Sequence, residues 1–192
     1  MTAERRPRLL VLASTFPAGA DDGTPAFVRD LACREAAEFD TLVLVPRVPG
    51  SLRRERTGPM IVERFRYFPR RFEDLAAGAI IENLRSRRSR WLQVMPFLVA
   101  EVWATHRAVR RHRPDVVHVH WIIPQGVAAL LAARRVPWLV TTLGGDVYTL
   151  TDPASRAVKR AVLRRAGAVT VMNQDMADRL IKIAAERAVH RG

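Results

Sequence analysis

Short apolar runs alternate along the chain with segments whose apolar residues recur at helical spacing. The runs at residues 9–13, 41–46, 115–120, 136–143 and 168–172 predict buried strands. Residues 60–68 alternate apolar and polar positions, with Arg64 and Arg66 on one side, which predicts a strand with one wet face near a sheet edge. Continuous apolar strands separated by helices are typical of parallel sheets that are covered on both faces.

Helical patterns fill the intervals between these strands. Helix-start signals stand at three places: Thr24 with Pro25, Asp152 with Pro153, and Asn173, from which a helix runs toward the end of the chain. Further helices are predicted at 73–88, 91–113 and 125–135, with a break or start at Pro96, and a loop is predicted at 49–59. The pattern predicts a single α/β domain over residues 1–192, Rossmann-like and doubly wound, with a mainly parallel sheet.

Composition narrows the class of protein. With 192 residues, 48% hydrophobic and 27% charged, the chain can bury a core and is not wholly disordered. A lone cysteine, Cys33, excludes an intrachain disulfide and a Cys-rich zinc site. The apolar start is too short for a signal peptide, and the longest apolar stretch, 91–104, falls short of the ~20 residues that span a bilayer. These features predict a cytoplasmic protein, with peripheral contact at the inner face of the membrane as an option.

Glycine-containing loops follow three of the predicted strands, at 14–24, 120–126 and 143–148. Ligands of doubly wound sheets bind outside the carboxyl ends of the strands, so these loops are expected to form one cleft. Glycine lets backbone approach a ligand, and the helix that follows each loop favours anionic groups. G-x-G-x-x-G, G-x-x-x-x-G-K-[ST] and G-x-S-x-G are all absent, which disfavours a dinucleotide oxidoreductase, a P-loop NTPase and an α/β-hydrolase.

Several residues in these loops have two interpretations. His118 and His120 have the spacing of a metal pair, but no third ligand is evident, so no metal is predicted and His118 is assigned to the core. His120 either lines the cleft or is structural. Asp146 either binds a ligand, the favoured interpretation, or caps a turn. Gly23 either lets phosphates approach or only makes the turn before Thr24.

In this order and spacing, the loops resemble the N-terminal domain of family-four glycosyltransferases of the GT-B fold. The resemblance covers nearly the whole chain, through residues 16–31, 66–70, 114–126, 136–147 and 165–172. Its most specific pieces are His-x-His-Trp-x-x-Pro-x-Gly at 118–126 and Gly-Gly-Asp at 144–146.

The resemblance implies retaining transfer of a sugar from a nucleotide-sugar donor to an acceptor. Two Rossmann-like domains face each other in that family; the N-terminal one binds the acceptor, and the C-terminal one holds the donor and carries a paired-glutamate motif. The chain is therefore expected to be the acceptor-binding half of a larger enzyme. Its partners would be the absent donor-binding domain and a sugar or lipid-linked acceptor. It would bind no cofactor by itself and would be inactive alone.

The resemblance also implies a set of residues that bind the acceptor or line the cleft: Gly23, Thr24, His120, Trp121, Gly126, Gly144, Gly145, Asp146 and Tyr148. The family commonly has a histidine where this chain has Leu143, so no catalytic residue is assigned. The backbone groups of Gly144 and Gly145 remain able to contact the sugar, and the Asp146 carboxylate remains able to accept a hydrogen bond from a sugar hydroxyl. Retaining transfer in this family is not thought to need a conventional protein nucleophile.

Positive charge is concentrated in the middle of the chain. The net charge is +13, and the segment between Arg47 and Arg113 holds 16 arginines and 6 acidic residues around the apolar stretch 91–104. That stretch has three interpretations. It is a core helix with solvated arginine ends, or it is a face that meets anionic lipid or a lipid-carried acceptor, or it forms a groove for an anionic or hydrophobic acceptor. Nucleic acid ranks last, because aromatic residues are not interleaved with the arginines. Two other classes stay open for the whole chain: a Rossmann-type oxidoreductase or methyltransferase, and a basic membrane- or nucleic-acid-binding module.

Overall fold

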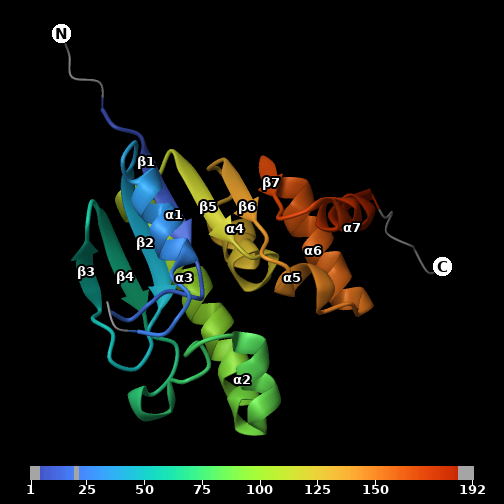
Figure 1. Cartoon of the computed structure of the whole chain (residues 1–192), viewed down its shortest axis with the longest axis horizontal. Helices are drawn as coiled ribbons and strands as arrows, with labels where there is room; N and C mark the ends of the chain where they lie inside the picture. Colours follow the sequence, from blue (N-terminus) through green and yellow to red (C-terminus); the bar gives the residue numbers. More distant parts are fainter. Residues whose placement is uncertain (1–4, 20–21, 186–192) are drawn as a thin grey trace.

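The computed structural model describes residues 5–19 and 22–185, which fold around one seven-stranded sheet (Figure 1). The order is β3-β4-β2-β1-β5-β6-β7; β3 runs antiparallel to β4, and the other neighbouring pairs are parallel. The strands are β1 (Arg8–Leu12), β2 (Asp40–Pro46), β3 (Arg54–Thr57), β4 (Met60–Phe65), β5 (Val116–His120), β6 (Trp138–Thr141) and β7 (Ala168–Thr170). The predicted α/β fold with a mainly parallel sheet is confirmed.

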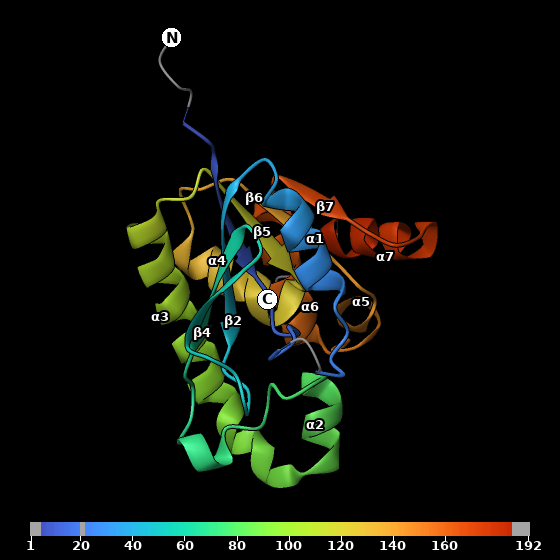
Figure 2. The same cartoon turned by 60° about the vertical axis from the view of Figure 1, so that its left-hand side comes forward.

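Helices cover both faces of this sheet (Figure 2). They are α1 (Phe27–Glu35), α2 (Ile80–Ser86), α3 (Val94–His112), α4 (Val127–Ala132), α5 (Gly145–Tyr148), α6 (Pro153–Arg165) and α7 (Gln174–Ala185). Short helical turns lie at Arg70–Phe72, Arg88–Gln93 and Ile122–Gly126. Within the described residues, no helix is long and apolar enough to cross a membrane.

Alternation along the central strand builds two hydrophobic layers. Leu9 and Val11 of β1 pack with the buried face of α1, whereas Leu10 and Leu12 pack with the inner faces of α3, α4 and α6. Successive side chains of a strand point to opposite faces, so a strand buried on both sides is apolar throughout. The apolar run at 9–13 is therefore uninterrupted because a hydrophobic layer covers each face of β1.

The segment 49–59, predicted to be a loop, contains strand β3. Arg54–Thr57 pairs antiparallel with β4 through a turn in which Gly58 has a φ of 56°. The strand reads Arg-Glu-Arg-Thr and lies at the edge of the sheet, where charged side chains discourage pairing with another chain. Its lack of apolar residues is the reason the hydrophobic pattern missed it.

The predicted wet face of the segment 60–68 is wrong at Arg64. This side chain is 4% exposed; its Nη2 donates to the Pro17 carbonyl at 2.7 Å and to Glu55 Oε1 at 3.0 Å. The guanidinium lies 5.5 Å from the centre of the Phe16 ring, and burial lowers its pKa. Arg64 therefore ties β4 to the loop that follows β1.

Two predicted helix starts are confirmed. The Asp152 side chain accepts the Ser155 N–H at 3.0 Å ahead of α6, and Asn173 Oδ1 accepts the Met176 N–H at 2.9 Å ahead of α7. The helix predicted to continue beyond Ala185 falls on residues 186–192, which lie outside the described part of the chain.

The predicted start at Thr24 is wrong. Helix α1 begins at Phe27 after Ala26, whose side chain makes no capping hydrogen bond. The Thr24 N–H and hydroxyl instead donate to Asp22 Oδ1, at 3.0 and 2.9 Å. Thr24 therefore closes a turn within the loop after β1.

The helix predicted at 73–88 is reduced to α2, because its first acidic residues bind loop groups. Glu73 Oε1 accepts the Tyr67 N–H at 2.8 Å, and Asp74 Oδ1 accepts the Gln93 amide at 2.8 Å. Such side-chain bonds offer the chain an alternative to helix. The helix predicted at 91–113 begins at Val94, and Pro96 lies in its first turn, where a missing N–H is tolerated.

Candidate functional site

The loops after β1, β5 and β6 leave three neighbouring strands at the same edge of the sheet. β1 pairs with β5, β5 pairs with β6, and all three run parallel. Their loops meet at the lower edge of the sheet in Figure 1, beside α5. The predicted convergence of the three loops is therefore present, in the position where doubly wound sheets bind ligands.

Two contacts join these loops. The Trp121 ring meets the Phe27 ring edge-on at 6.1 Å, which links the β5 loop to the start of α1. Asp146 Oδ2 accepts the Ile122 N–H at 2.7 Å, which links the β5 loop to α5. Trp121 itself has a φ of 72°, an uncommon conformation for a bulky residue, and its N–H donates to the Thr141 carbonyl at 2.9 Å. These contacts fix the backbone of the β5 loop against both neighbours.

The two histidines of β5 lie inside the fold. His118 Nδ1 donates to Glu35 Oε1 at 2.5 Å, and its Nε2 lies 2.7 Å from Thr141 Oγ1, so the ring bridges α1 and β6. His118 is thus a core residue, as predicted. His120 is 1% exposed and stacks on His118 with ring centres 4.4 Å apart.

His120 is held neutral. Burial, helped by the neighbouring His118, lowers the pKa of His120 to about 3, and neither ring nitrogen has a hydrogen-bond partner among the described residues. A neutral imidazole near pH 7 carries no charge to bind an anion. The ring is therefore a support beneath the β5 loop rather than an exposed part of its surface.

Asp146 lies at the junction of two loops and is 3% exposed. Burial raises the pKa of its carboxyl group, and within the described part of the chain Oδ1 has no hydrogen-bond partner. Lys159 of α6, itself buried, donates from Nζ to the Thr149 carbonyl at 2.5 Å and attracts the Asp146 carboxylate electrostatically. The carboxylate holds the β5 loop through the Ile122 N–H. The sequence did not reveal this contact.

Gly126 has a packing role. A Cβ built at Gly126 would lie 2.6 Å from Val162 Cγ1 of α6, and real Cβ atoms do not approach that closely. Its N–H donates to the Trp121 carbonyl at 3.2 Å, which closes the β5 loop. Gly126 therefore lets α6 pack closely against this loop.

Replacing Gly126 with Ala is expected to destabilise the domain by about 1–2 kcal/mol, because α6 or the loop must shift to admit the methyl group. Urea unfolding measures this loss. Gly145→Ala is the matched control, since nothing lies within 4 Å of a Cβ there. The additional change Val162→Ala should recover part of the loss in a double-mutant cycle. Equal stability of Gly126→Ala and wild type would contradict the packing role.

The other predicted residues differ in their surroundings. Gly23 and Gly145 are exposed and have open space around them, Thr24 is half-buried, and Gly144 adopts a φ of 105° that suits glycine alone. The Tyr148 hydroxyl donates to Asp175 Oδ2 at 2.7 Å, so this ring is tied to α7. The structure thus brings His120, Trp121 and Asp146 together and leaves Tyr148 at the margin of the group.

Asp22 is a site residue that the sequence analysis missed. Its carboxylate accepts the Ala18 N–H at 2.6 Å in addition to both bonds from Thr24, and these backbone bonds lower its pKa. The Asp-x-Thr spacing is the signal that predicts such a turn. Asp22 and Arg64 together fold the loop after β1 around Gly23.

A second missed pair lies under the β5 loop. Gln125 Nε2 donates to Glu101 Oε1 of α3 at 2.8 Å, and both side chains are buried. Burial raises the pKa of Glu101 to about 8, so the acid is protonated at neutral pH. Among the described residues, neither Glu101 Oε2 nor Gln125 Oε1 has a hydrogen-bond partner. The pair locks the β5 loop to α3.

Leu143 supplies no ionisable group to this edge of the sheet. It is half-buried, next to the positive-φ backbone of Gly144. Within residues 5–19 and 22–185, no group of three or more His, Cys, Asp or Glu side chains is placed to hold a metal ion. The loops at this edge therefore present exposed glycine backbone at Gly23 and Gly145, with the buried ring of His120 beneath them.

The comparison of solved structures finds the same fold in an enzyme of known class. Sucrose-phosphate synthase from Thermosynechococcus elongatus matches with a TM-score of 0.62 at 17% identity, over 92% of this chain and 45% of that chain. UDP-GlcNAc 2-epimerase from Methanocaldococcus jannaschii matches with a TM-score of 0.47 at 9% identity, over 93% of this chain and 43% of that one. The chain thus spans less than half the length of these proteins.

Sequence comparison gives the family directly. No curated protein matches the chain. Residues 22–191, which include the last residues of the first loop and all of the other two, match the family described as "Glycosyl transferase 4-like domain". This match favours a glycosyltransferase over an oxidoreductase or a methyltransferase, in agreement with the predicted resemblance. The chain belongs to the glycosyl transferase 4-like domain family.

Proposed function

We propose that the chain is the acceptor-binding half of a retaining glycosyltransferase. In this proposal a second, donor-binding domain supplies the nucleotide sugar, and the chain holds the acceptor at the carboxyl edge of its sheet. The observation that carries the proposal is the convergence of three loops, after β1, β5 and β6, in a domain of this family. The chain's span of 45% of sucrose-phosphate synthase supports a second domain of similar size.

The residues of the edge have separate tasks in this proposal. Gly23 and Gly145 present exposed backbone that an acceptor hydroxyl can approach. Trp121 and Asp146 hold the β5 loop in position, through the ring contact with Phe27 and the bond to Ile122. With Leu143 in the position of the family histidine, this half contributes binding and orientation, and the reacting groups are the acceptor hydroxyl and the anomeric carbon of the donor, which leaves its nucleotide.

The place of action is part of the proposal. A cytoplasmic location agrees with the lone thiol of Cys33, which is free. The acceptor is a sugar or a lipid-linked sugar, and the donor nucleotide sugar belongs to the second domain. The chain alone is then expected to bind acceptor without turning over donor.

Gly145→Ala tests the role of the cleft backbone in a protein that joins this chain to its donor-binding domain. The methyl group has open space in the fold, so the thermal unfolding midpoint should stay unchanged. Transfer should fall about tenfold or more, because the methyl group displaces the acceptor from its reacting position. Radiolabelled transfer assays read the rate. Wild-type transfer by this variant would remove Gly145 from the proposed binding surface.

A further inference from the structure

An apolar stripe runs along the outer surface of α3 and the turn before it. Trp91, Met95, Val99 and Trp103 follow one another at four-residue spacing, and each is more than 60% exposed. Leu92 beside them is 73% exposed. Because residues four apart lie on one face of a helix, these side chains form one continuous ridge. A protein surface in contact with water rarely leaves such a patch open unless it binds something.

The opposite side of the same helix is ordinary core. Phe97, Ala104 and Ala108 of α3 are buried against the sheet. One side of the helix therefore belongs to the core, as one of the three predicted interpretations has it, and the other side is an apolar face toward solvent.

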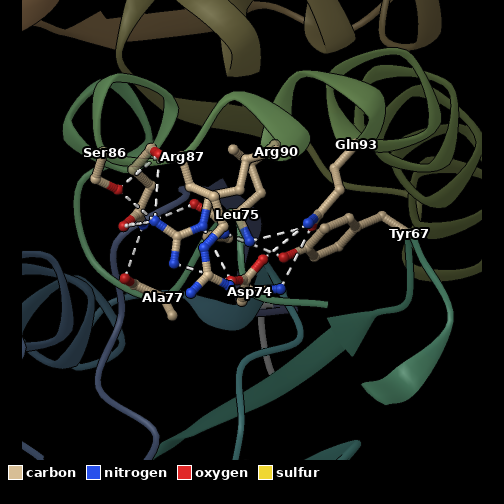
Figure 3. A network of polar contacts seen from close by, with 10 residues as sticks. Tyr67, Asp74, Leu75, Ala77, Ser86, Arg87, Arg90 and Gln93 are labelled. Carbon is tan, nitrogen blue, oxygen red and sulfur yellow. Dashed lines mark hydrogen bonds and ion pairs between the residues drawn. The ribbon is translucent and has the colours of Figure 1, made fainter. Parts of the chain in front are cut away.

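A polar network holds the start of the stripe outward (Figure 3). Arg90 Nε donates to Asp74 Oδ2 at 3.0 Å, and Gln93 Nε2 donates to Asp74 Oδ1 at 2.8 Å. The hydrogen bond from Arg90, and after it the one from Gln93, lowers the pKa of Asp74. Since Arg90 and Gln93 point inward to this carboxylate, the two residues between them, Trp91 and Leu92, project into solvent.

The stripe is bordered by positive charge, and its own segment has no exposed acid. Exposed arginines lie before it at Arg87 and Arg88, and after it at Arg107, Arg110 and Arg111. Between residues 87 and 113 the sequence has a single acidic residue, Glu101, and it is buried. Arg107 lies over the Trp103 ring at 5.5 Å from its centre. A partner surface that complements this face would be apolar where it meets the stripe and anionic where it meets the arginines.

A hollow of about 610 Å³ joins this face to the carboxyl edge of the sheet. It is lined by Arg66, Tyr67 and Phe68, which follow β4, and by Pro96, Val99, Ala100 and Trp103 of α3. The first half of α3 thus lies beside the edge from which the candidate site opens, with α2 below it (Figure 2). A partner seated on the stripe would lie next to the cleft.

We propose that the α3 stripe, residues 91–103 with their arginine border, docks on the surface of an anionic membrane. Tryptophan, methionine and valine enter the interface between head groups and acyl chains, and the arginines bind lipid phosphates. Tryptophan rings favour this depth, and the long arginine side chains reach the head groups beside them. The proposal goes beyond sugar transfer and does not rest on it, because vesicle binding is measured without donor or acceptor.

Co-sedimentation of the chain with vesicles tests the proposal. Vesicles of phosphatidylcholine containing about one-third phosphatidylglycerol should bind the chain at least tenfold more tightly than phosphatidylcholine alone. Emission of Trp91 and Trp103 should shift to shorter wavelength on binding, since both rings leave water. Equal affinity for both vesicles, or no binding to either, would overturn the proposal.

Paired variants separate the stripe from general surface chemistry. Trp91→Ser with Trp103→Ser, and Arg107→Gln with Arg110→Gln, should each weaken vesicle binding about tenfold or more. The matched controls are Leu131→Ser with Ile181→Ser, and Arg134→Gln with Arg135→Gln, which change exposed residues of the same kinds elsewhere. Equal losses in the controls would overturn the proposal. So would a dimer in solution that the Trp variants abolish, because the stripe would then be an interface between copies.

Discussion

Replacing Glu101 with Gln is expected to remove a large part of the pH dependence of folding stability between about pH 5 and pH 8. The pKa of Glu101 is about 8 in the folded chain against an ordinary 4.5. Between these values the unfolded chain has lost the proton that the folded chain keeps, so the wild-type free energy of unfolding falls as pH rises. The slope from this group is about 1.4 kcal/mol per pH unit.

The substitution Glu101→Gln isolates the proton, because a glutamine side chain is not ionisable and its amide oxygen can accept the hydrogen bond that Gln125 Nε2 donates to Glu101 Oε1. Urea unfolding at pH 5.5, 6.5 and 7.5 should show the variant gaining on wild type by about 3 kcal/mol over this range. Glu82→Gln, on the exposed surface of α2, is the control, and its free energy of unfolding should follow the same pH dependence as that of wild type. Parallel pH profiles for wild type and Glu101→Gln would show that Glu101 ionises normally, which would contradict its buried pairing.

Replacing Asp146 with Ala is expected to destabilise the domain by about 3 kcal/mol. The change leaves the buried Ile122 N–H without an acceptor and opens a small cavity between α5 and the β5 loop. It also removes the carboxylate that attracts the Lys159 ammonium most strongly. Thermal and urea unfolding measure the loss, and amide hydrogen exchange at Ile122 locates it, since this N–H should exchange more rapidly than in wild type.

Asp146→Asn is the matched variant, because its side-chain carbonyl can still accept the Ile122 N–H. Its loss should be less than half of that of Asp146→Ala. In an enzyme that carries both halves, transfer should follow the same order, with Asn close to wild type and Ala reduced through the displaced loop. Equal stability of both variants and wild type would mean that the loop does not depend on this carboxylate.

The hydrophobic pattern of the sequence was sufficient for the parallel strands of the sheet and for its site edge. Runs such as 9–13 are apolar throughout because a hydrophobic layer covers each face of the sheet, and their shortness favours a strand over a helix. The three loops could be placed at one edge since parallel strands end together. Caps with a local mechanism, Asp152 and Asn173, were also predictable.

Features that depend on distant partners could not be predicted. Arg64 can be buried because the Pro17 carbonyl and the Glu55 carboxylate accept hydrogen bonds from its guanidinium group. No local sequence pattern predicts those contacts. Gly126 was assigned to the cleft because a glycine at a strand end fits ligand approach as well as it fits packing against Val162. Tyr148 was assigned there too, whereas Asp175, in a helix that starts later in the chain, ties its hydroxyl to α7.

Sugar transfer from a panel of labelled nucleotide sugars is the most direct test of the proposed division of labour. The acceptors are simple hexoses and a membrane lipid extract, and the proteins are the chain alone and the chain joined to its donor-binding domain. The joined protein should transfer one of the sugars with retained anomeric configuration, read from the anomeric coupling in a proton NMR spectrum, and the chain alone should show no detectable transfer. Robust transfer by residues 1–192 alone, or an inverted linkage from the joined protein, would contradict an acceptor-binding half of a retaining enzyme.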